Sequence, residues 1–381
     1  MRNRNVLLLG ISIFALHFGL GVHMSTWMNF LKEDLNLPVQ KVGIVESLRE
    51  VPGLFSVLLV AVMLAFSQCR AAGVCMIVFA FGMAGYCLVQ GIGSLILVSV
   101  VWSLGFHVWL PLSDSMVLDT APKGHEGAHV GRMRSVGFAA MFVGLLMVFG
   151  LGLLHQRQVI AFPIYRYAYL SAGLVGLVGA AACFAIDTTV GKTPPRNLMW
   201  KREYGLYYWL MFLAGCRKQI FLTLAVLVLV KIHGAPVHHI AAMMILYNFA
   251  NWFGAPLLGR GIDRLGERPV LTFNYAGLVL VFIGYAVFQA CWVLYVLYCI
   301  DNLFNIFNIA LTTYLKRIAK PEDIAPSLAM GVTANHLASV IMPLVACFIW
   351  EHVDYRVAFV LGACLAACSL LSTQWIRAKP H

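Results

Sequence analysis

The stretch Gly259-Arg-Gly-Ile-Asp-Arg-Leu-Gly-Glu-Arg268 decides how this sequence is interpreted. All of its residues except Ile262 and Leu265 are glycine or charged, although only 11% of the 381 residues are charged. Long apolar stretches flank it on both sides. Because unpaired charges are costly in hydrocarbon, we expect a tight charged loop between two membrane helices. An ordinary basic loop on the inner side of the membrane is the alternative.

Composition places the whole chain in the membrane. It is 61% hydrophobic and has a mean hydropathy of +0.83, far above that of soluble proteins. Apolar runs able to cross roughly 30 Å of hydrocarbon recur along the chain. We predict an all-α membrane protein with twelve transmembrane helices, at residues 6–31, 39–66, 71–89, 93–119, 130–154, 162–186, 204–231, 237–258, 269–289, 291–315, 328–350 and 355–376. Arg2 and Arg4 lead directly into the first span, so no cleavable signal peptide is expected.

The net charge of +11 sets the orientation and does not indicate nucleic-acid binding. With the N-terminus inside, one set of loops holds Arg2, Arg4, Arg70, Lys123, Arg132, Lys192, Arg196, Lys201, Arg202, Arg260, Arg264, Arg268, Lys316, Arg317, Lys320, Arg377 and Lys379. The opposite set holds only Lys32, Lys41, Arg157, Arg166, Lys231 and Arg356. This asymmetry predicts cytoplasmic N- and C-termini in a plasma (inner) membrane.

The arrangement Gly-x-x-x-Asp-Arg-x-Gly-x-Arg, formed by Gly259, Asp263, Arg264, Gly266 and Arg268, resembles the signature loop of the major facilitator superfamily of secondary transporters. The resemblance implies two six-helix bundles related by an axis along the membrane normal, with substrate bound between them. In that family the loop joins the second helix of a half to the third. The corresponding segment of the first half, residues 67–73, keeps only Arg70 and Gly73.

The longest charged connection, from Thr188 to Glu203, lies at the midpoint and contains Pro194-Pro195. We therefore predict an N-terminal bundle at 1–187, a cytoplasmic linker at 188–203 and a C-terminal bundle at 204–381. Leu37-Pro38-Val39 and Ala235-Pro236-Val237 are weak echoes of a duplication.

Basic residues inside spans are the first candidates for function, because they are costly there unless they face a wet cavity or a partner. Arg217 and Lys218 lie about thirteen residues into the seventh span, roughly 20 Å deep. Adjacent helical residues point about 100° apart, so the two need not share one wall. In the second span, Glu46, Arg49 and Glu50 share a face at i, i+3 and i+4, as a coupling element or as an internal salt bridge.

The tenth span presents Asp301, Asn305, Asn308 and Thr312 as a polar stripe, with Asn302 just beside it. The resemblance implies that this helix lines the central cavity, whereas a packing stripe of asparagines is the alternative. His17 in the first span and His336 in the eleventh are weaker candidates for substrate binding. Asp114 and Asp119, near the cytoplasmic end of the fourth span, can pair with Arg70 or Arg132 as a gate.

We predict a proton-coupled carrier of a small organic anion or zwitterion that works by alternating access. Its substrate contacts are Arg217, Lys218, Arg49, Asn305, Asn308, Asn302, His17 and His336, and its proton carriers are Asp301, Glu50 or Glu46. Its gate comprises Gly259, Asp263, Arg264, Gly266, Arg268, Asp114 and Asp119. The ten cysteines and twelve histidines form no metal motif, so no metal or cofactor is expected, and we expect a monomer.

Three alternatives stay open at this point. The first is a drug or metabolite exporter with an apolar, aromatic pocket. The second is a polytopic lipid-modifying membrane enzyme, which would need a nucleophile and a base at recognisable spacing, and we find no such pair. The third is a sensor that has a carrier's fold without transporting.

Overall fold

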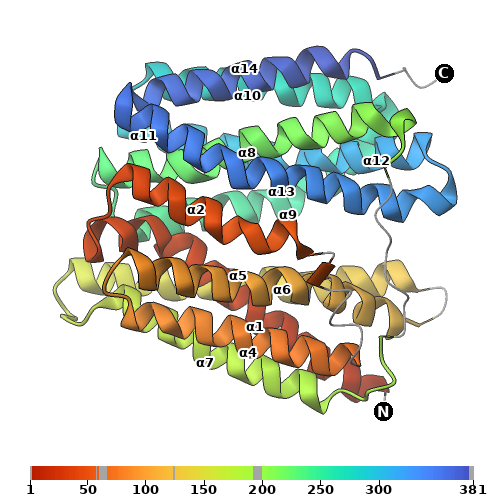
Figure 1. The fold of residues 1–381 in the computed structure, drawn as a ribbon, viewed down its shortest axis with the longest axis horizontal. Coiled ribbons are helices and arrows are strands. Elements are labelled where there is room, and N and C mark those ends of the chain that lie inside the picture. Colours follow the sequence, from red (N-terminus) through yellow and green to blue (C-terminus); the bar gives the residue numbers. More distant parts are fainter. Residues whose placement is uncertain (1, 57, 60–66, 123–124, 192–199, 377–381) are drawn as a thin grey trace. The chain divides into compact units, whose positions relative to one another are not determined.

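The computed structural model describes residues 2–56, 58–59, 67–122, 125–191 and 200–376. In these ranges all regular secondary structure is helical. Ten of the described helical segments are long and apolar enough to cross a membrane. With α2 (Val39–Leu54) and α9 (Val237–Leu265), they follow the order of the twelve predicted spans. The fold is therefore an all-α membrane fold of twelve helices (Figure 1).

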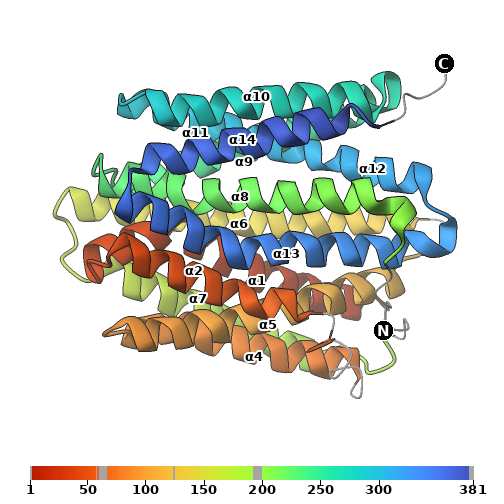
Figure 2. The same ribbon diagram turned by 45° about the horizontal axis from the view of Figure 1, so that its top comes forward.

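The chain divides into two compact units. The first comprises Met1–Asn36, Leu48–Pro195 and Pro236–Ala242, and the second comprises Leu37–Ser47, Arg196–Ala235 and Met243–His381. The first turns of α2 thus belong to the second unit, and the first turns of α9 belong to the first unit. Within each unit the helices lie side by side along a common direction (Figures 1 and 2).

In the first unit, α1 (Arg2–Asn29) packs against α6 (Glu126–Gln156) and α7 (Ile164–Ala185), while α4 (Gln68–Gly85) packs against α5 (Ile92–Asp119) and α7. Glycines allow the backbones to approach closely, as small residues do between membrane helices. A Cβ atom on Gly21 of α1 would lie 2.5 Å from the carbonyl oxygen of Met141 in α6. A Cβ on Gly144 of α6 would lie 2.6 Å from the Phe18 oxygen. Side chains at these two positions would force α1 and α6 apart.

Two short elements extend helices of the first unit. A π-helix, Phe30–Asp34, continues α1, and a 3₁₀ turn, Tyr86–Leu88, continues α4. In the π-helix, Glu33 accepts a hydrogen bond from the Tyr165 hydroxyl, and Asp34 pairs with Arg166 at 3.2 Å. Both partners belong to α7, so these contacts fix the end of α1 to its neighbour.

In the second unit, α8 (Gly205–Lys231) packs against α13 (Pro321–His352) and α14 (Tyr355–Thr373), and α14 packs against α10 (Glu267–Val287). Figure 2 shows α10 and α14 next to each other. The remaining elements are a 3₁₀ turn at Arg202–Tyr204, α11 (Cys291–Phe304), a 3₁₀ turn at Asn305–Asn308 and α12 (Ile309–Ile318). A buried core that includes Tyr207, Tyr275 and Leu311 joins α8, α10 and α12.

The predicted loop at residues 259–268 is wrong in its extent, because α9 continues to Leu265 and α10 begins at Glu267. Only Gly266 separates the two helices, with a φ of 82° that L side chains rarely adopt. A helix can leave the hydrocarbon and continue in the polar headgroup region. The positive charge of Arg264, in the last turn of α9, interacts favourably with the negative end of the helix dipole. Hydropathy therefore located the membrane boundary and not the end of the helix.

The tenth span was predicted as one continuous helix over 291–315. It is interrupted instead by the 3₁₀ turn Asn305–Asn308 between α11 and α12. In a 3₁₀ turn side chains three residues apart eclipse each other, and the Asn308 amide accordingly donates to Asn305 Oδ1 at 2.8 Å. An interruption of this kind can mark a hinge or strain within a helix.

Candidate functional site

Arg217 occupies a closely packed part of α8 in the second unit. Its side chain is only 6% exposed. Two residues earlier, a Cβ on Gly215 would lie 2.6 Å from the Asn335 carbonyl oxygen of α13, and the Asn335 amide donates to the Met211 oxygen at 3.3 Å. The absence of a side chain at Gly215 thus lets α13 approach α8 and position the backbone that carries Arg217.

Polar groups of the tenth span converge on Arg217. A small cavity of about 10 Å³ is lined by Arg217, Lys218, Leu222, Asp301, Asn302 and Asn305. Its volume is about that of one water molecule, so it identifies converging side chains and does not outline a substrate. The structure therefore brings five of the predicted site residues together within one unit.

The guanidinium of Arg217 lies 5.8 Å from the ring centroid of Tyr275 in α10. A cation over an aromatic face is stabilised by the ring quadrupole. Nevertheless, among the described residues Nε of Arg217 and Oδ1 of Asp301 are buried without a hydrogen-bond partner. Such groups are rare in folded proteins and require an explanation. They leave unused donor and acceptor capacity beside the cavity.

The polar residues at and near this cavity differ in their exposure and contacts. Lys218 is exposed, whereas Arg217 is buried, as expected from their 100° separation on a helix. The amide of Asn302 donates to the Tyr298 oxygen at 2.9 Å, which is a contact with its own helix. Asn308 is engaged with Asn305, and neither Asn308 nor His336 lines the cavity.

In the first unit, Arg49 is held in a network of hydrogen bonds. It forms an ion pair with Glu50 at 3.0 Å and a hydrogen bond with His23 at 3.2 Å. Its guanidinium lies 5.8 Å from the Trp102 ring centroid. Glu46, predicted on the same face of α2, is 2% exposed and belongs to the second unit. His23 was not among the predicted residues, because nothing in the sequence distinguishes it from the other histidines of the spans, such as His17.

His17, on the same helix α1, is oriented by its own backbone. Its Nδ1 donates to the Ile13 oxygen at 2.8 Å. Asp114 of α5 is close enough to His17 to interact electrostatically. Asp119, predicted as part of the gate, accepts a hydrogen bond through Oδ2 from the Gly191 backbone at 2.8 Å. This contact fixes the segment after α7 to the end of α5.

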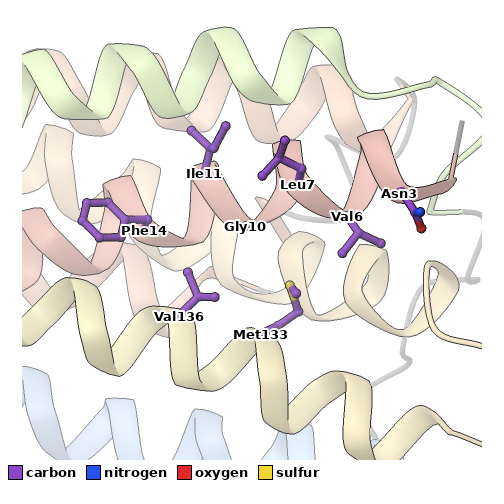
Figure 3. Close-up of a pocket in the computed structure, with 8 residues that line it drawn as sticks. All are labelled: Asn3, Val6, Leu7, Gly10, Ile11, Phe14, Met133 and Val136. Carbon is purple, nitrogen blue, oxygen red and sulfur yellow. The ribbon is translucent and has the colours of Figure 1, made fainter.

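A larger groove in the first unit lies between α1 and α6 (Figure 3). It measures about 500 Å³ and is lined by Asn3, Val6, Leu7, Gly10, Ile11, Phe14, Met133 and Val136. Figure 3 shows Met133 and Val136 directed from α6 toward α1. Asn3 provides the polar side chain of an otherwise apolar lining, so this groove lacks the chemistry to orient a charged substrate.

The signature segment, residues 259–268, contributes polar contacts at its C-terminal end. Glu267 is 8% exposed and pairs with Arg317, in the last turn of α12, at 3.1 Å. Arg268 donates to Gln374 Oε1 from Nε at 3.3 Å and from Nη2 at 3.2 Å. Arg264 is exposed, and the surroundings of Gly259 and the side chain of Asp263 lie outside what the structure describes. The observed ion pair therefore involves Glu267, which the motif comparison did not single out.

A second polar cluster holds the segment before α8 against the start of α13. Asp323 accepts hydrogen bonds from Lys201 at 2.6 Å and from the Tyr204 hydroxyl at 2.8 Å. The hydrogen bond from Lys201, followed by that from Tyr204, lowers the pKa of Asp323 below its usual value. The same contact with Asp323 raises the pKa of Lys201. No sequence motif marks this cluster, because 122 residues separate the two charges.

Comparisons with known proteins give a family match for part of the chain. Residues 207–381 match the family model described as Major Facilitator Superfamily. A search of curated protein sequences finds no match. Among solved structures, a point mutant of the nucleoside transporter NupG superposes with a TM-score of 0.82 at 14% identity, covering 98% of this chain and 99% of that one.

Other transporters superpose over similar lengths. A D-xylose-proton symporter gives a TM-score of 0.73 at 14% identity, covering 97% of both chains. A peptide transporter, POT, gives 0.72 at 12% identity, covering 97% of this chain and 93% of that one. At these identities the likeness concerns the fold, and it extends over nearly the whole chain. Residues 207–381 therefore match the Major Facilitator Superfamily, and the chain as a whole shares the fold of these solved transporters.

Proposed function

We propose that this transporter carries a small organic anion or zwitterion by alternating access, coupled to protons, and that Arg217 is its main anion contact. The buried guanidinium of Arg217 beside Asp301 and Asn305 is the observation that carries the proposal. A guanidinium offers a planar fork of donors that suits a carboxylate or phosphate. Its Nε is unpaired among the described side chains, so an incoming anion has a donor to engage.

Asp301 is the proposed proton carrier. It lines the same cavity as Arg217, so its negative charge competes with an anionic substrate for the guanidinium. Protonation removes that competition, and proton and anion binding therefore become linked with positive sign. Glu50 and Glu46 are the alternatives. Glu50 is a weaker one because it is paired with Arg49.

The proposed gate is the signature segment. The contacts between Glu267 and Arg317 and between Arg268 and Gln374 join the start of α10 to the ends of α12 and α14. Ion pairs at helix ends can hold one of two arrangements of a transporter. Asp263, Arg264, Asp114 and Asp119 complete the proposed gate, and the predicted bundles at 1–187 and 204–381 are the bodies that move.

The proposed setting is a plasma membrane, with both termini in the cytoplasm and the chain working as a monomer. The distribution of basic residues supports this orientation, because positively charged loops stay on the cytoplasmic side. Fusing a reporter that is active only in the cytoplasm to either end tests it. A reporter that is inactive at both ends would show that the termini lie on the opposite side of the membrane.

Ligand binding to the purified protein tests the anion site. A thermal-shift screen against carboxylates, phosphates, amino acids, nucleosides, peptides and sugars should identify ligands that raise the melting temperature. Arg217→Ala should weaken binding of the best anionic ligand by about 10- to 100-fold, since charge-assisted hydrogen bonds contribute about 1.5–3 kcal/mol. Arg217→Lys should keep the charge but lose the bidentate geometry.

Arg157→Lys, at the exposed end of α6, is the matched control and should bind as the wild type does. If Arg217→Ala binds the ligand with wild-type affinity, Arg217 is not the anion contact. If only lipophilic cations stabilise the protein, the proposal of an anion carrier is replaced by that of an exporter with an apolar, aromatic pocket. Flux into proteoliposomes with and without a pH gradient then tests the coupling.

A further inference from the structure

His23 is a buried histidine at the centre of the first unit. It is 2% exposed and lies within an aromatic cage. The distances from its ring centroid are 4.5 Å to Trp102, 4.9 Å to Trp27, 5.8 Å to Tyr169 and 5.9 Å to Tyr86. His23 and the rings around it come from four elements: α1, the 3₁₀ turn Tyr86–Leu88, α5 and α7. Such convergence on one imidazole goes beyond ordinary packing.

The hydrogen bonds of His23 define its protonation state. Nη1 of Arg49 lies 3.2 Å from Nε2, and the Tyr169 hydroxyl lies 3.2 Å from Nδ1. An arginine has donors and no acceptor, so Nε2 must accept and carries no proton. The imidazole is then neutral with its proton on Nδ1, which donates to the Tyr169 oxygen.

The charges around His23 balance while it is neutral. The titratable groups that surround it on the elements packed against it are Arg49 and Glu50 of α2, Tyr86 of the 3₁₀ turn, His107 of α5 and Tyr169 of α7. Arg49 and Glu50 form an ion pair at 3.0 Å, so their charges cancel. His107 is connected through Ser103, whose hydroxyl contacts both its Nδ1 and the Arg49 carbonyl oxygen.

We propose that Nε2 of His23 is a proton-binding site and that protonation displaces the Arg49 guanidinium. A proton from water would take the Nε2 lone pair, and the hydrogen bond from Arg49 would be lost because both groups would then be donors. Two cations would face each other with Glu50 as their shared counter-ion. Arg49 is thereby released from the cage while His23 keeps its bond to Tyr169.

This site is separate from the Asp301 site proposed above. Use of the His23 proton in transport rests on the proposed function, whereas protonation itself does not require a substrate. Release of Arg49 would add a positively charged donor in the first unit when a proton is bound. The ligand class of the site is therefore the proton itself.

Tryptophan fluorescence tests this proposal directly. An imidazolium quenches indole emission by contact, and Trp27 and Trp102 are the tryptophans beside His23. The purified protein, without substrate, should lose emission in a one-proton step between about pH 6.5 and about pH 4, below the ordinary histidine range, because the imidazolium must form in a buried site beside the Arg49 guanidinium. His23→Gln should abolish the step, because the glutamine oxygen can still accept from Arg49 but cannot be protonated.

Two controls make the outcome decisive. His352→Gln removes an exposed histidine at the end of α13 and should keep the step. Arg217→Ala should also keep it, so failure of the anion site and failure of the His23 site are distinguishable. A step that persists in His23→Gln, or a wild type without a step in this range, overturns the proposal.

Thermal melting shows whether His23→Gln folds. If His23→Gln does not fold, the double variant Trp27→Phe/Trp102→Phe, which keeps His23, is measured instead. This variant should lose the step, since the other seven of the nine tryptophans are not the reporters. A step that survives without Trp27 and Trp102 would place the titrating group elsewhere and overturn the assignment.

Discussion

Arg49 and Arg217 both lie within membrane helices, but their contacts differ. Arg49 in the first unit has a carboxylate at 3.0 Å, an imidazole at 3.2 Å and a tryptophan ring beside it. Arg217 in the second unit lies over Tyr275, and no ion pair joins it to a carboxylate among the described residues. Arg49 is therefore part of a neutralised structural network, whereas Arg217 keeps binding capacity. The comparison shows that two arginines within apolar helices can differ in how directly a carboxylate pairs with them.

The largest expected effect separates the two arginines by stability. Arg49→Ala removes the ion-pair partner of Glu50 and a hydrogen-bond donor of His23, and breaking a largely buried ion pair in this way costs about 3 kcal/mol. Arg217→Ala should cost less, because it removes only the longer-range attraction to Asp301 and no direct ion pair among the described residues. Melting temperatures of the two variants in detergent measure the difference. Equal losses of melting temperature in the two variants would contradict this comparison. Adding Glu50→Gln to Arg49→Ala should recover part of the lost melting temperature.

The next effect concerns the close approach that positions Arg217. Gly215→Ala places a methyl group 2.6 Å from the Asn335 oxygen, so α8 and α13 must separate. Overpacking of this kind costs about 1–3 kcal/mol, and anion binding should weaken with it. Gly205→Ala on the same helix is the matched control, since its Cβ would meet nothing within 4 Å. A normal melting temperature in Gly215→Ala would show that this contact adjusts freely.

A smaller effect distinguishes the gate from both arginine sites. Glu267→Gln weakens the contact with Arg317, and Asp263→Asn removes a charge of the signature segment. Each should change the balance between access states by about 1 kcal/mol, a few-fold in rate. Flux should therefore fall more than equilibrium binding. Equal losses in flux and binding, or none in either, would mean that the segment only sets topology.

The smallest effect is the pH dependence of the contact between Lys201 and Asp323. The pKa of Asp323 is lowered from 3.8, so its contribution is present above that value and is lost as the pH falls through the folded-state pKa. The pKa of Lys201 is raised from 10.5, so its contribution is present below that value and is lost as the pH rises further. The difference in melting temperature between wild type and Asp323→Asn should therefore be constant between about pH 5 and about pH 9. A change within that window would require another titrating partner.

Sequence patterns predicted the helices better than their interruptions. The twelve apolar runs are correct in number and order, because a span in hydrocarbon must satisfy its backbone internally. The 3₁₀ turn at Asn305–Asn308 was missed, since its residues continue the same apolar and polar pattern. The helical extent of the signature segment was missed because charge marks the membrane surface and not the end of hydrogen bonding.

Among candidate site residues, the sequence identified those whose charge is energetically costly inside an apolar span. Arg217 and Asp301 could be selected from the sequence, because ionisable groups inside apolar spans require a reason. Tyr275 and His23 could not be selected, because nothing in the sequence distinguishes them from the other tyrosines and histidines of the spans. Their importance depends on contacts across 58 residues, from Arg217 to Tyr275, and 26 residues, from His23 to Arg49.

By itself, the sequence determined the membrane class and the order of the spans, because the thickness of hydrocarbon imposes length and polarity on each segment independently. Only the tertiary structure decided which charges meet. Glu267 reaches Arg317, Lys201 reaches Asp323, and Arg49 reaches His23. These pairings depend on which helices pack together and how each is rotated about its axis. Helix rotation follows from the fit of side chains at each contact, which hydropathy does not encode.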